Sequence, residues 1–312
     1  MKLYRAVISA KSSVLSPLQS DTLFGAFCWN YRAIKGEKAL TELIGGFRGD
    51  RPPVIFSNAF PHDALPLPFG IRDPGADMRK EAAQEEKLAS YKRGKKLKNA
   101  RYVSIGAFNR ILQGNCQGIT EEMAESGETT VQNLKNSVNR ETGTVGSDEG
   151  GDLYSKEEIF HAPGSLLDVY VKTGLDEAIL RETLGIMFAL GIGADKSTGK
   201  GAFDMREVAG FTGFDEPEAP NGFISLSNFI PKAKDPVRGY YRVFAKYGKL
   251  DREYANSPTP FKKPLLFLRC GSAFYDEAPK EWYGRGVFGV SAVSPDIMVN
   301  GCCIPVRAKL PG

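Results

Sequence analysis

Apolar and polar residues follow strand and helix periods through residues 1–210. Apolar side chains alternate along residues 3–9, which predicts a first strand, and Ser20 or Asp21 can cap a helix that begins at Thr22. The remaining predicted elements are a helix at 37–44, a strand at 54–56, extended structure at 101–112, a strand at 165–171, a helix at 175–190 and a strand at 202–208. Taken in order, these elements predict a βαββαβ plan of the ferredoxin-like type, in which two helices cover one face of an antiparallel sheet.

Two insertions and a second half complete the predicted organisation. Residues 74–98 are charged and rich in Ala, Glu and Lys, which favours a helical insertion. Residues 114–160 begin with a stretch poor in bulky apolar residues, which predicts a long loop or hairpin. We assign residues 1–212 to an N-terminal domain and residues 213–222 to a linker rich in Pro, Glu and Gly. The strand-rich residues 223–312 are expected to form a second such domain, so the predicted class is α+β with tandem ferredoxin-like, RRM-like domains.

Composition and charge narrow the class of protein but assign no site. The chain has 312 residues, of which 42% are hydrophobic and 25% charged, as is ordinary for a globular protein of about two domains. Its net charge of +4 excludes a polybasic binder, although residues 79–101 form a basic block that can face either a partner or solvent. Five cysteines without a CxxC pair favour a reducing, cytoplasmic location, and two histidines without zinc-like spacing argue against a metal site. No apolar run is long enough to span a membrane.

Four glycines follow the predicted helix at 175–190 in a G-x-G-x5-G-x-G spacing. They are Gly191, Gly193, Gly199 and Gly201, and the residues among them include Lys196, Ser197, Thr198 and Lys200. A nucleotide-binding P-loop is excluded because the spacing is one residue too long, a glycine replaces the Mg²⁺-binding Ser or Thr, and the loop follows a helix. A plain helix-to-strand turn needs only one or two glycines. Backbone N–H groups beside lysines favour binding of an extended chain of phosphates.

Three further segments carry a resemblance to a known family. Residues 20–26 read SDTLFGA, residues 135–143 read KNSVNRETG, and residues 151–154 read GDLY. Together with the glycine loop, they resemble the RAMP superfamily of CRISPR-associated RNA-binding proteins, and in particular the Csm-type, Cas5-like subunit of type III-A effector complexes. The resemblance covers residues 1–210 well, and Asn139 stands where many relatives have Asp.

This resemblance implies a function and a set of partners. It implies a subunit that is not an enzyme, caps the 5′ handle of the guide crRNA in antiviral defence, and contacts the large palm-polymerase subunit and the first backbone RAMP subunit. It also implies that the hairpin within 114–160, called a thumb in such proteins, wedges into the RNA. The candidate RNA-binding residues are Ser20, Asn136, Asn139, Arg140, Gly191, Gly193, Lys196, Ser197, Thr198, Gly199, Lys200 and Gly201. We assign no catalytic residue, metal or cofactor.

An RNA-processing endoribonuclease of the same superfamily is the alternative function. His62, His161 or Asp195 would have to supply its general acid and base. We expect His62 to be a surface residue, His161 to pack or to contact RNA, and Asp195 to be solvated between glycines. The processing enzymes usually carry their glycine loop near the C-terminus, whereas 111 residues follow Gly201 here.

A run of aromatic residues among basic ones leaves two interpretations open. Tyr240, Tyr241, Phe244 and Tyr247 lie within residues 232–249, which also contain six Lys and Arg. Aromatic rings flanked by positive charge bind single-stranded RNA by stacking. Aromatic residues that alternate along a strand are equally typical of a protein core.

Overall fold

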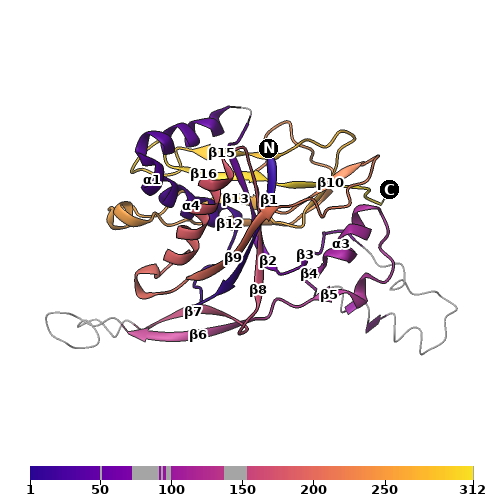
Figure 1. The fold of residues 1–312 in the computed structure, drawn as a ribbon, viewed down its shortest axis with the longest axis horizontal. Helices are drawn as coiled ribbons and strands as arrows, with labels where there is room; N and C mark the ends of the chain where they lie inside the picture. The colour runs from indigo at the N-terminus through magenta and orange to yellow at the C-terminus, as the bar shows by residue number, and fades with distance from the viewer. Residues whose placement is uncertain (50, 72–90, 93, 96–99, 137–152, 312) are drawn as a thin grey trace.

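A four-stranded antiparallel sheet forms the centre of the N-terminal part (Figure 1). The computed structural model describes residues 1–311 apart from 50, 72–90, 93, 96–99 and 137–152, so most of the predicted insertion at 74–98 lies outside the described residues. In sheet order, the strands are β2 (Val54–Pro61), β8 (Leu166–Thr173), β1 (Lys2–Ala10) and β9 (Phe203–Gly210). Ala6, Val7 and Ile8 of β1 are buried in succession, which means that both faces of this central strand are covered.

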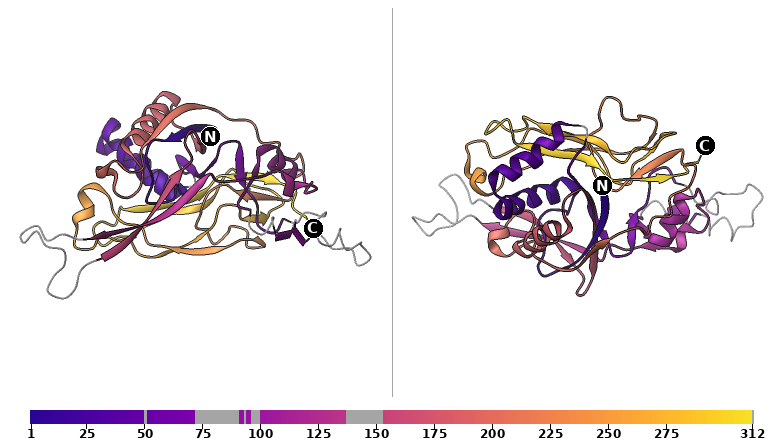
Figure 2. Two further views of the ribbon diagram at one scale, coloured as in Figure 1. Left: turned by 90° about the horizontal axis from the view of Figure 1, so that it is seen from below. Right: turned by 45° about the horizontal axis from the view of Figure 1, so that its top comes forward.

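Two long helices cover one face of this sheet (Figures 1 and 2). They are α1 (Ser20–Gly45) and α4 (Glu177–Leu190), which pack against each other. The helices predicted from Thr22 and at 37–44 both lie within α1 and meet at a kink, where Gly36 adopts the non-helical angles φ 85° and ψ 171°. The predicted cap of α1 is wrong. The capping position is Gln19, because the Ser20 hydroxyl instead donates to the Asn228 carbonyl at 3.0 Å.

A smaller layer covers the other face of the sheet. It consists of β3 (Ala64–Pro66), β4 (Tyr102–Ser104), β5 (Met123–Ala124) and α3 (Ile105–Leu112). The extended structure predicted over 101–112 is therefore wrong after residue 104, because the Ser104 hydroxyl accepts a hydrogen bond from Ala107 N at 3.1 Å and starts a helix. Phe214, in the predicted linker, packs between Phe108 of α3 and Tyr170 of β8, with ring centroids 6.1 and 5.4 Å apart.

The long insertion after α3 contains a two-stranded hairpin that projects from the body (Figure 1). Its strands are β6 (Glu128–Asn136) and β7 (Leu153–His161), paired from Glu128↔His161 to Asn136↔Leu153. The loop or hairpin predicted for this insertion thus takes the form of a hairpin over residues 128–161, where it is described.

The described 3₁₀ turns of the chain are η1 (Gly46–Arg48), η3 (Ile119–Glu121), η4 (Lys196–Thr198) and η5 (Arg252–Asn256).

The C-terminal part consists of short strands. They are β10 (Gly222–Ser225), β11 (Gly239–Tyr240), β12 (Val243–Lys246), β13 (Leu265–Leu268), β14 (Ala273–Tyr275), β15 (Tyr283–Phe288), β16 (Met298–Cys303) and β17 (Pro305–Ala308). One sheet has the order β11-β14-β10-β17, and β12–β13 and β15–β16 form hairpins. Among the described residues after 212 the only helical element is the η5 turn, so this part differs from the predicted βαββαβ plan in having no α-helix.

The two parts share one hydrophobic core. The largest cluster of buried residues includes side chains from β1, β2, β8, α1 and α4 together with Ile224, Ile304 and Val306. Figure 2 shows α1 between α4 and β16, and buried hydrogen bonds cross the junction, such as Ser227 Oγ to the Phe56 carbonyl at 2.7 Å. None of the helices in the described part of the chain is long and apolar enough to cross a membrane.

Candidate nucleic-acid interface

The glycine loop between α4 and β9 requires glycine at both of its ends. Gly191 and Gly201 have φ of 92° and 74°, and Ile192 N donates to the Gly201 carbonyl at 2.9 Å. A Cβ atom on Gly201 would lie 2.1 Å from the Ile192 carbonyl oxygen, and one on Gly191 would lie 2.7 Å from the Lys200 carbonyl oxygen. The two ends of the loop are therefore in backbone-to-backbone contact that no side chain permits.

The middle of the loop presents unpaired backbone N–H groups. Those of Gly193, Ala194 and Asp195 donate no hydrogen bond to any described residue, whereas Thr198 N and Gly199 N donate within the loop to Asp195 O and Lys196 O, each at 3.0 Å. Successive free N–H groups in a tight turn form a concave site for an anion. The backbone part of the predicted phosphate site is thus available in the folded chain.

The lysines of the loop contact carboxylates within the chain. Lys200 forms an ion pair with Glu158 of β7 and also donates to the Ser13 hydroxyl at 2.9 Å, and Lys196 forms an ion pair with Asp251 of the C-terminal part. Asp195 is also engaged, because its carboxylate accepts from Lys156 Nζ at 2.6 Å. Asp195 is therefore not the solvated carboxylate that its glycine neighbours predict.

Glu158 is the centre of this network. Its buried carboxylate accepts hydrogen bonds from Lys200, from Ser13 and, at 2.6 Å, from Asn133 of β6. The Lys200 ammonium and the Ser13 hydroxyl lower the pKa of this carboxyl from 4.5 to about 2. One charged group therefore joins the glycine loop, both strands of the hairpin and the segment that follows β1.

The hairpin also presents apolar side chains to solvent on the face opposite this network. Leu134 is 76% exposed and Leu153 is 66% exposed, and both lie on the face opposite Asn133 and Lys156. Leucines exposed to this degree on a projecting hairpin are typical of a surface that binds a partner.

The structure brings only some of the predicted site residues together. Gly191, Gly193, Lys196, Ser197, Thr198, Gly199, Lys200 and Gly201 form one loop, and Asn136 lies exposed at the end of β6. Asn139 and Arg140 lie outside the described residues. Ser20 is buried at the start of α1, where its hydroxyl is used within the chain. The sequence reasoning missed Ser13, Asn133, Lys156, Glu158 and Asp251, whose only sequence signal is their charge or polarity.

The two histidines lie in different surroundings. His62 is not a simple surface residue as expected, because its Nδ1 lies 2.7 Å from Oδ1 of the fully buried Asp168. Asp63 completes a group of three residues that could hold a metal ion, but the Arg5 guanidinium lies 2.9 Å from Asp63 and 3.8 Å from Asp168 and already supplies a positive charge there. His161 packs edge-on against Phe203 as predicted, and burial lowers its pKa.

The aromatic run after residue 239 divides between core and surface. Phe244 packs on the buried Phe267 with ring centroids 5.7 Å apart, as the core interpretation predicts. Tyr240, Tyr241 and Tyr247 are 44%, 46% and 69% exposed. Tyr241 stacks one face on Phe274 at 5.5 Å and 14°, which holds the ring rigidly at the surface. The interpretation as an exposed aromatic surface therefore holds for the three tyrosines.

The family model of the RAMP superfamily matches residues 9–204, which is more than half of the chain. The match begins in β1 and ends in β9, so it includes the hairpin and the glycine loop. The chain belongs to the RAMP superfamily.

Individual relatives narrow the resemblance within that superfamily. The CRISPR-system protein Csm4 of Thermococcus onnurineus (strain NA1) is 26% identical over 249 residues, which cover 74% of each chain. A solved Csm1–Csm4 cassette in complex with cA4 matches with a TM-score of 0.64 and 20% identity over 99% of each chain. A Csm3–Csm4 subcomplex in the type III-A CRISPR–Cas interference complex matches with a TM-score of 0.60 and 17% identity over 100% of each chain. The resemblance to a Csm-type RAMP protein is thereby confirmed.

Proposed function

We propose that this chain is a non-catalytic RNA-binding subunit of a type III-A CRISPR effector complex, in which it holds the 5′ handle of the crRNA. The free N–H groups of Gly193, Ala194 and Asp195 carry this proposal, because backbone donors without an internal acceptor suit phosphate oxygens. The loop lysines have a supporting role: their ion pairs with Glu158 and Asp251 fix the loop in the conformation that presents these donors.

The hairpin acts as the thumb beside this site. The middle of its strand β7 is joined to the glycine loop through Glu158 and Lys156, so a phosphate chain on the loop runs next to the hairpin. Leu134 and Leu153 then supply apolar side chains that can insert against unstacked bases.

The names of the solved relatives support the choice of protein partners. One relative structure pairs Csm4 with Csm1 and another pairs Csm4 with Csm3. We infer that this chain contacts the corresponding large palm-polymerase subunit and the backbone RAMP subunit. Val243 and Leu266, exposed on the β12–β13 hairpin, are candidate contacts for a protein partner. A cytoplasmic location and a role in antiviral defence follow from this assignment and stay predictions.

The proposed architecture is a ferredoxin-like N-terminal domain with a strand-rich C-terminal part. The succession β1-α1-β2-β8-α4-β9 and the sheet order β2-β8-β1-β9 support the first of these. The division into domains at residues 213–222 stays a prediction.

The effect of the loop backbone on guide RNA binding tests the proposal. Gly199 has φ 81° and ψ 13°, and a Cβ atom there meets no atom within 4 Å, so Gly199→Ala strains the loop backbone without a steric clash. Gly118 provides a matched control, because it has φ 73° and ψ 11° with equally open space. We expect Gly199→Ala to weaken binding of crRNA carrying the 5′ handle about tenfold, and Gly118→Ala to leave it unchanged. Equal affinities of the two variants would contradict a role for the loop.

The processing endoribonuclease remains the alternative function. The His161 side chain is buried and Asp195 is paired with Lys156, whereas His62 is hydrogen-bonded to Asp168 through Nδ1 and keeps Nε2 for acid or base chemistry, which makes it the residue to test. We expect uncleaved repeat RNA to stay intact when it is incubated with the purified chain. Cleavage that is lost in the His62→Ala variant, with RNA binding retained, would establish the enzyme instead.

A further inference from the structure

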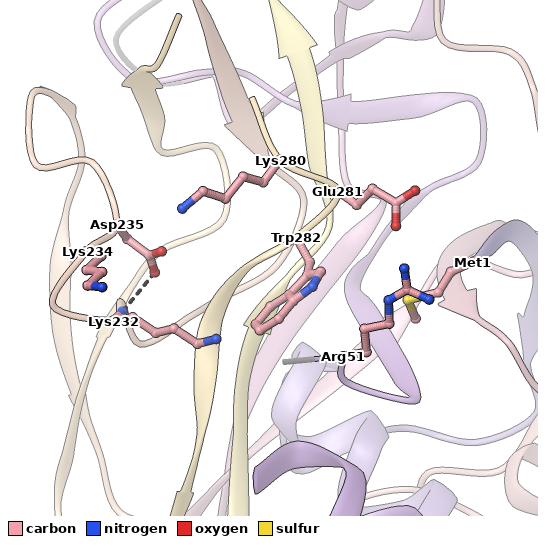
Figure 3. Close-up of a pocket in the computed structure, with 8 residues that line it drawn as sticks. All are labelled: Met1, Arg51, Lys232, Lys234, Asp235, Lys280, Glu281 and Trp282. Atoms are coloured by element: carbon pink, nitrogen blue, oxygen red, sulfur yellow. Dashed lines mark hydrogen bonds between the residues drawn. The ribbon is translucent and has the colours of Figure 1, made fainter. Parts of the chain in front are cut away.

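A basic pocket lies beside Met1, directly before the first residue of β1 (Figure 3). It has a volume of about 590 Å³ and is lined by Met1, Arg51, Lys232, Lys234, Asp235, Lys280, Glu281 and Trp282. Met1 precedes β1, whereas Ser13, which contacts the loop through Lys200, follows it. A strand of nine residues separates the two places, a length of about 30 Å. The pocket is therefore a separate site.

Within the described part of the chain, the cations of this pocket have no carboxylate partner. Four of the lining residues are Lys or Arg and two are acidic, which leaves a formal excess of two positive charges. Among the described residues, no carboxylate oxygen lies within 4.0 Å of a side-chain nitrogen of Arg51, Lys232, Lys234 or Lys280. Unpaired cations gathered in a concave site attract an anionic ligand.

The buried carboxylate of the pocket has a structural role. One oxygen of Asp235 accepts hydrogen bonds from Lys232 N at 2.8 Å and from Gly284 N at 2.9 Å. These bonds fix the turn that carries Lys232 and Lys234 against β15. Glu281 is consequently the only lining carboxylate that is exposed to an incoming ligand.

An indole ring lies directly beside the cations. The Lys232 ammonium is 3.9 Å from the centroid of the half-buried Trp282 ring. Figure 3 shows Lys232 and Lys280 on one side of Trp282 and Arg51 on the other. An anion held by Lys232 therefore lies next to an aromatic surface. This combination suits a phosphate that carries a base or sugar better than it suits a bare anion, and the volume is in the range of about 300–1,000 Å³ that small-molecule sites have.

We propose that this pocket binds a phosphorylated nucleotide, with the phosphate between Lys232 and Lys280 and the base or ribose against Trp282. The nucleotide can be free or can belong to an RNA strand, since both present the same groups. The proposal goes beyond the crRNA site of the glycine loop and does not depend on it.

The fluorescence of Trp282 tests this proposal in the full chain. The chain has two tryptophans, so Trp29→Phe leaves Trp282 as the only indole reporter. In this background we expect AMP or a short single-stranded oligoribonucleotide to change the emission saturably. Replacing both Lys232 and Lys280 by Ala should weaken binding, so that the ligand concentration at half-saturation rises about tenfold or more. The matched control replaces Lys35 and Lys38, two exposed lysines of α1, and should leave the midpoint unchanged.

The choice of ligand in the titration separates the outcomes. Tighter binding of AMP identifies a free nucleotide as the ligand, and tighter binding of the oligoribonucleotide identifies RNA. The assignment would be overturned if inorganic phosphate or a polyglutamate peptide bound as tightly as either nucleotide ligand. It would also be overturned if the Lys232 and Lys280 substitutions left the half-saturation concentration unchanged. The same titration on the Gly199→Ala variant separates the pocket from the glycine loop. Binding of the nucleotide to the pocket should be unchanged in this variant, even if the variant no longer binds crRNA.

Discussion

The glycine loop and the basic pocket both contain lysines, but these lysines have different surroundings. Lys196 and Lys200 are each paired with a carboxylate of the chain, whereas Lys232 and Lys280 have no such partner among the described residues. In the loop, the groups without a partner are backbone N–H groups; in the pocket, they are ammonium groups that contact aromatic rings but no carboxylate of the described chain. The difference indicates that lysines near a binding loop can serve to hold its shape, while the contacts to the ligand come from the backbone.

The largest effect should come from the closed ends of the glycine loop. Gly201→Ala places a Cβ atom 2.1 Å from a backbone oxygen and also strains a left-handed φ of 74°. We expect the free energy of unfolding to fall by about 3 kcal/mol or more, against about 1 kcal/mol for Gly199→Ala, where space is open. Urea unfolding of both variants measures this difference. Equal losses would show that the close contact between Ile192 and Gly201 is not a constraint.

A smaller loss should follow from removing the charge at the centre of the loop network. Glu158→Gln leaves the Lys200 ammonium without its carboxylate, and we expect a loss of about 2 kcal/mol. Because the folded state lowers the pKa of Glu158 from 4.5 to about 2, its stabilisation is complete above pH 4.5 and is lost as the pH falls towards 2. Unfolding measured across this range should therefore be less pH-dependent in Glu158→Gln. The exposed neighbour Glu157 offers the control Glu157→Gln, which should behave as the unsubstituted chain.

The salt dependence of RNA binding should separate paired from unpaired lysines. If the pocket ligand is RNA, Lys280→Ala should reduce the slope of log affinity against log salt by about 0.7, the effect of one lost contact to a single-stranded phosphate. Lys196→Ala should reduce the slope for crRNA binding by clearly less, because its charge is already neutralised by Asp251. A full reduction with Lys196→Ala would mean that this lysine leaves Asp251 to bind RNA.

The smallest effect should come from freeing a loop lysine. Asp251→Asn removes the partner of Lys196 in a pair that is partly exposed, so the free energy of unfolding should change by less than about 0.5 kcal/mol. Because this ion pair helps to hold the loop in shape, crRNA binding should weaken about twofold. Fluorescence anisotropy with labelled crRNA is sensitive enough to detect this change. A tighter complex would contradict this role and would show that Lys196, once released from Asp251, binds RNA directly.

Much of the N-terminal fold could be predicted from local patterns. Alternating apolar residues mark β1, and the apolar run at 165–171 marks β8. The helix predicted at 175–190 is confirmed as α4, where Asp176 accepts hydrogen bonds from Ala178 N and Ile179 N at 2.9 and 3.3 Å. The glycine spacing also predicted the loop, because each of its four glycines has a positive φ. These features depend on short-range periodicity and on the conformational freedom of glycine, both of which are visible in the sequence.

The partners of the charged side chains were decided by the tertiary structure alone. Lys200 is 42 residues from Glu158 and Lys196 is 55 residues from Asp251, and no periodic pattern links such pairs. The basic pocket likewise combines Arg51 with side chains that lie more than 180 residues later in the chain. The tertiary structure also decided which aromatic residues after 239 are in the core: Phe244 packs on Phe267 of β13, whereas Tyr247 is exposed. Hydrophobic periodicity determines which face of an element is buried, but the neighbours of a charge depend on how the elements pack.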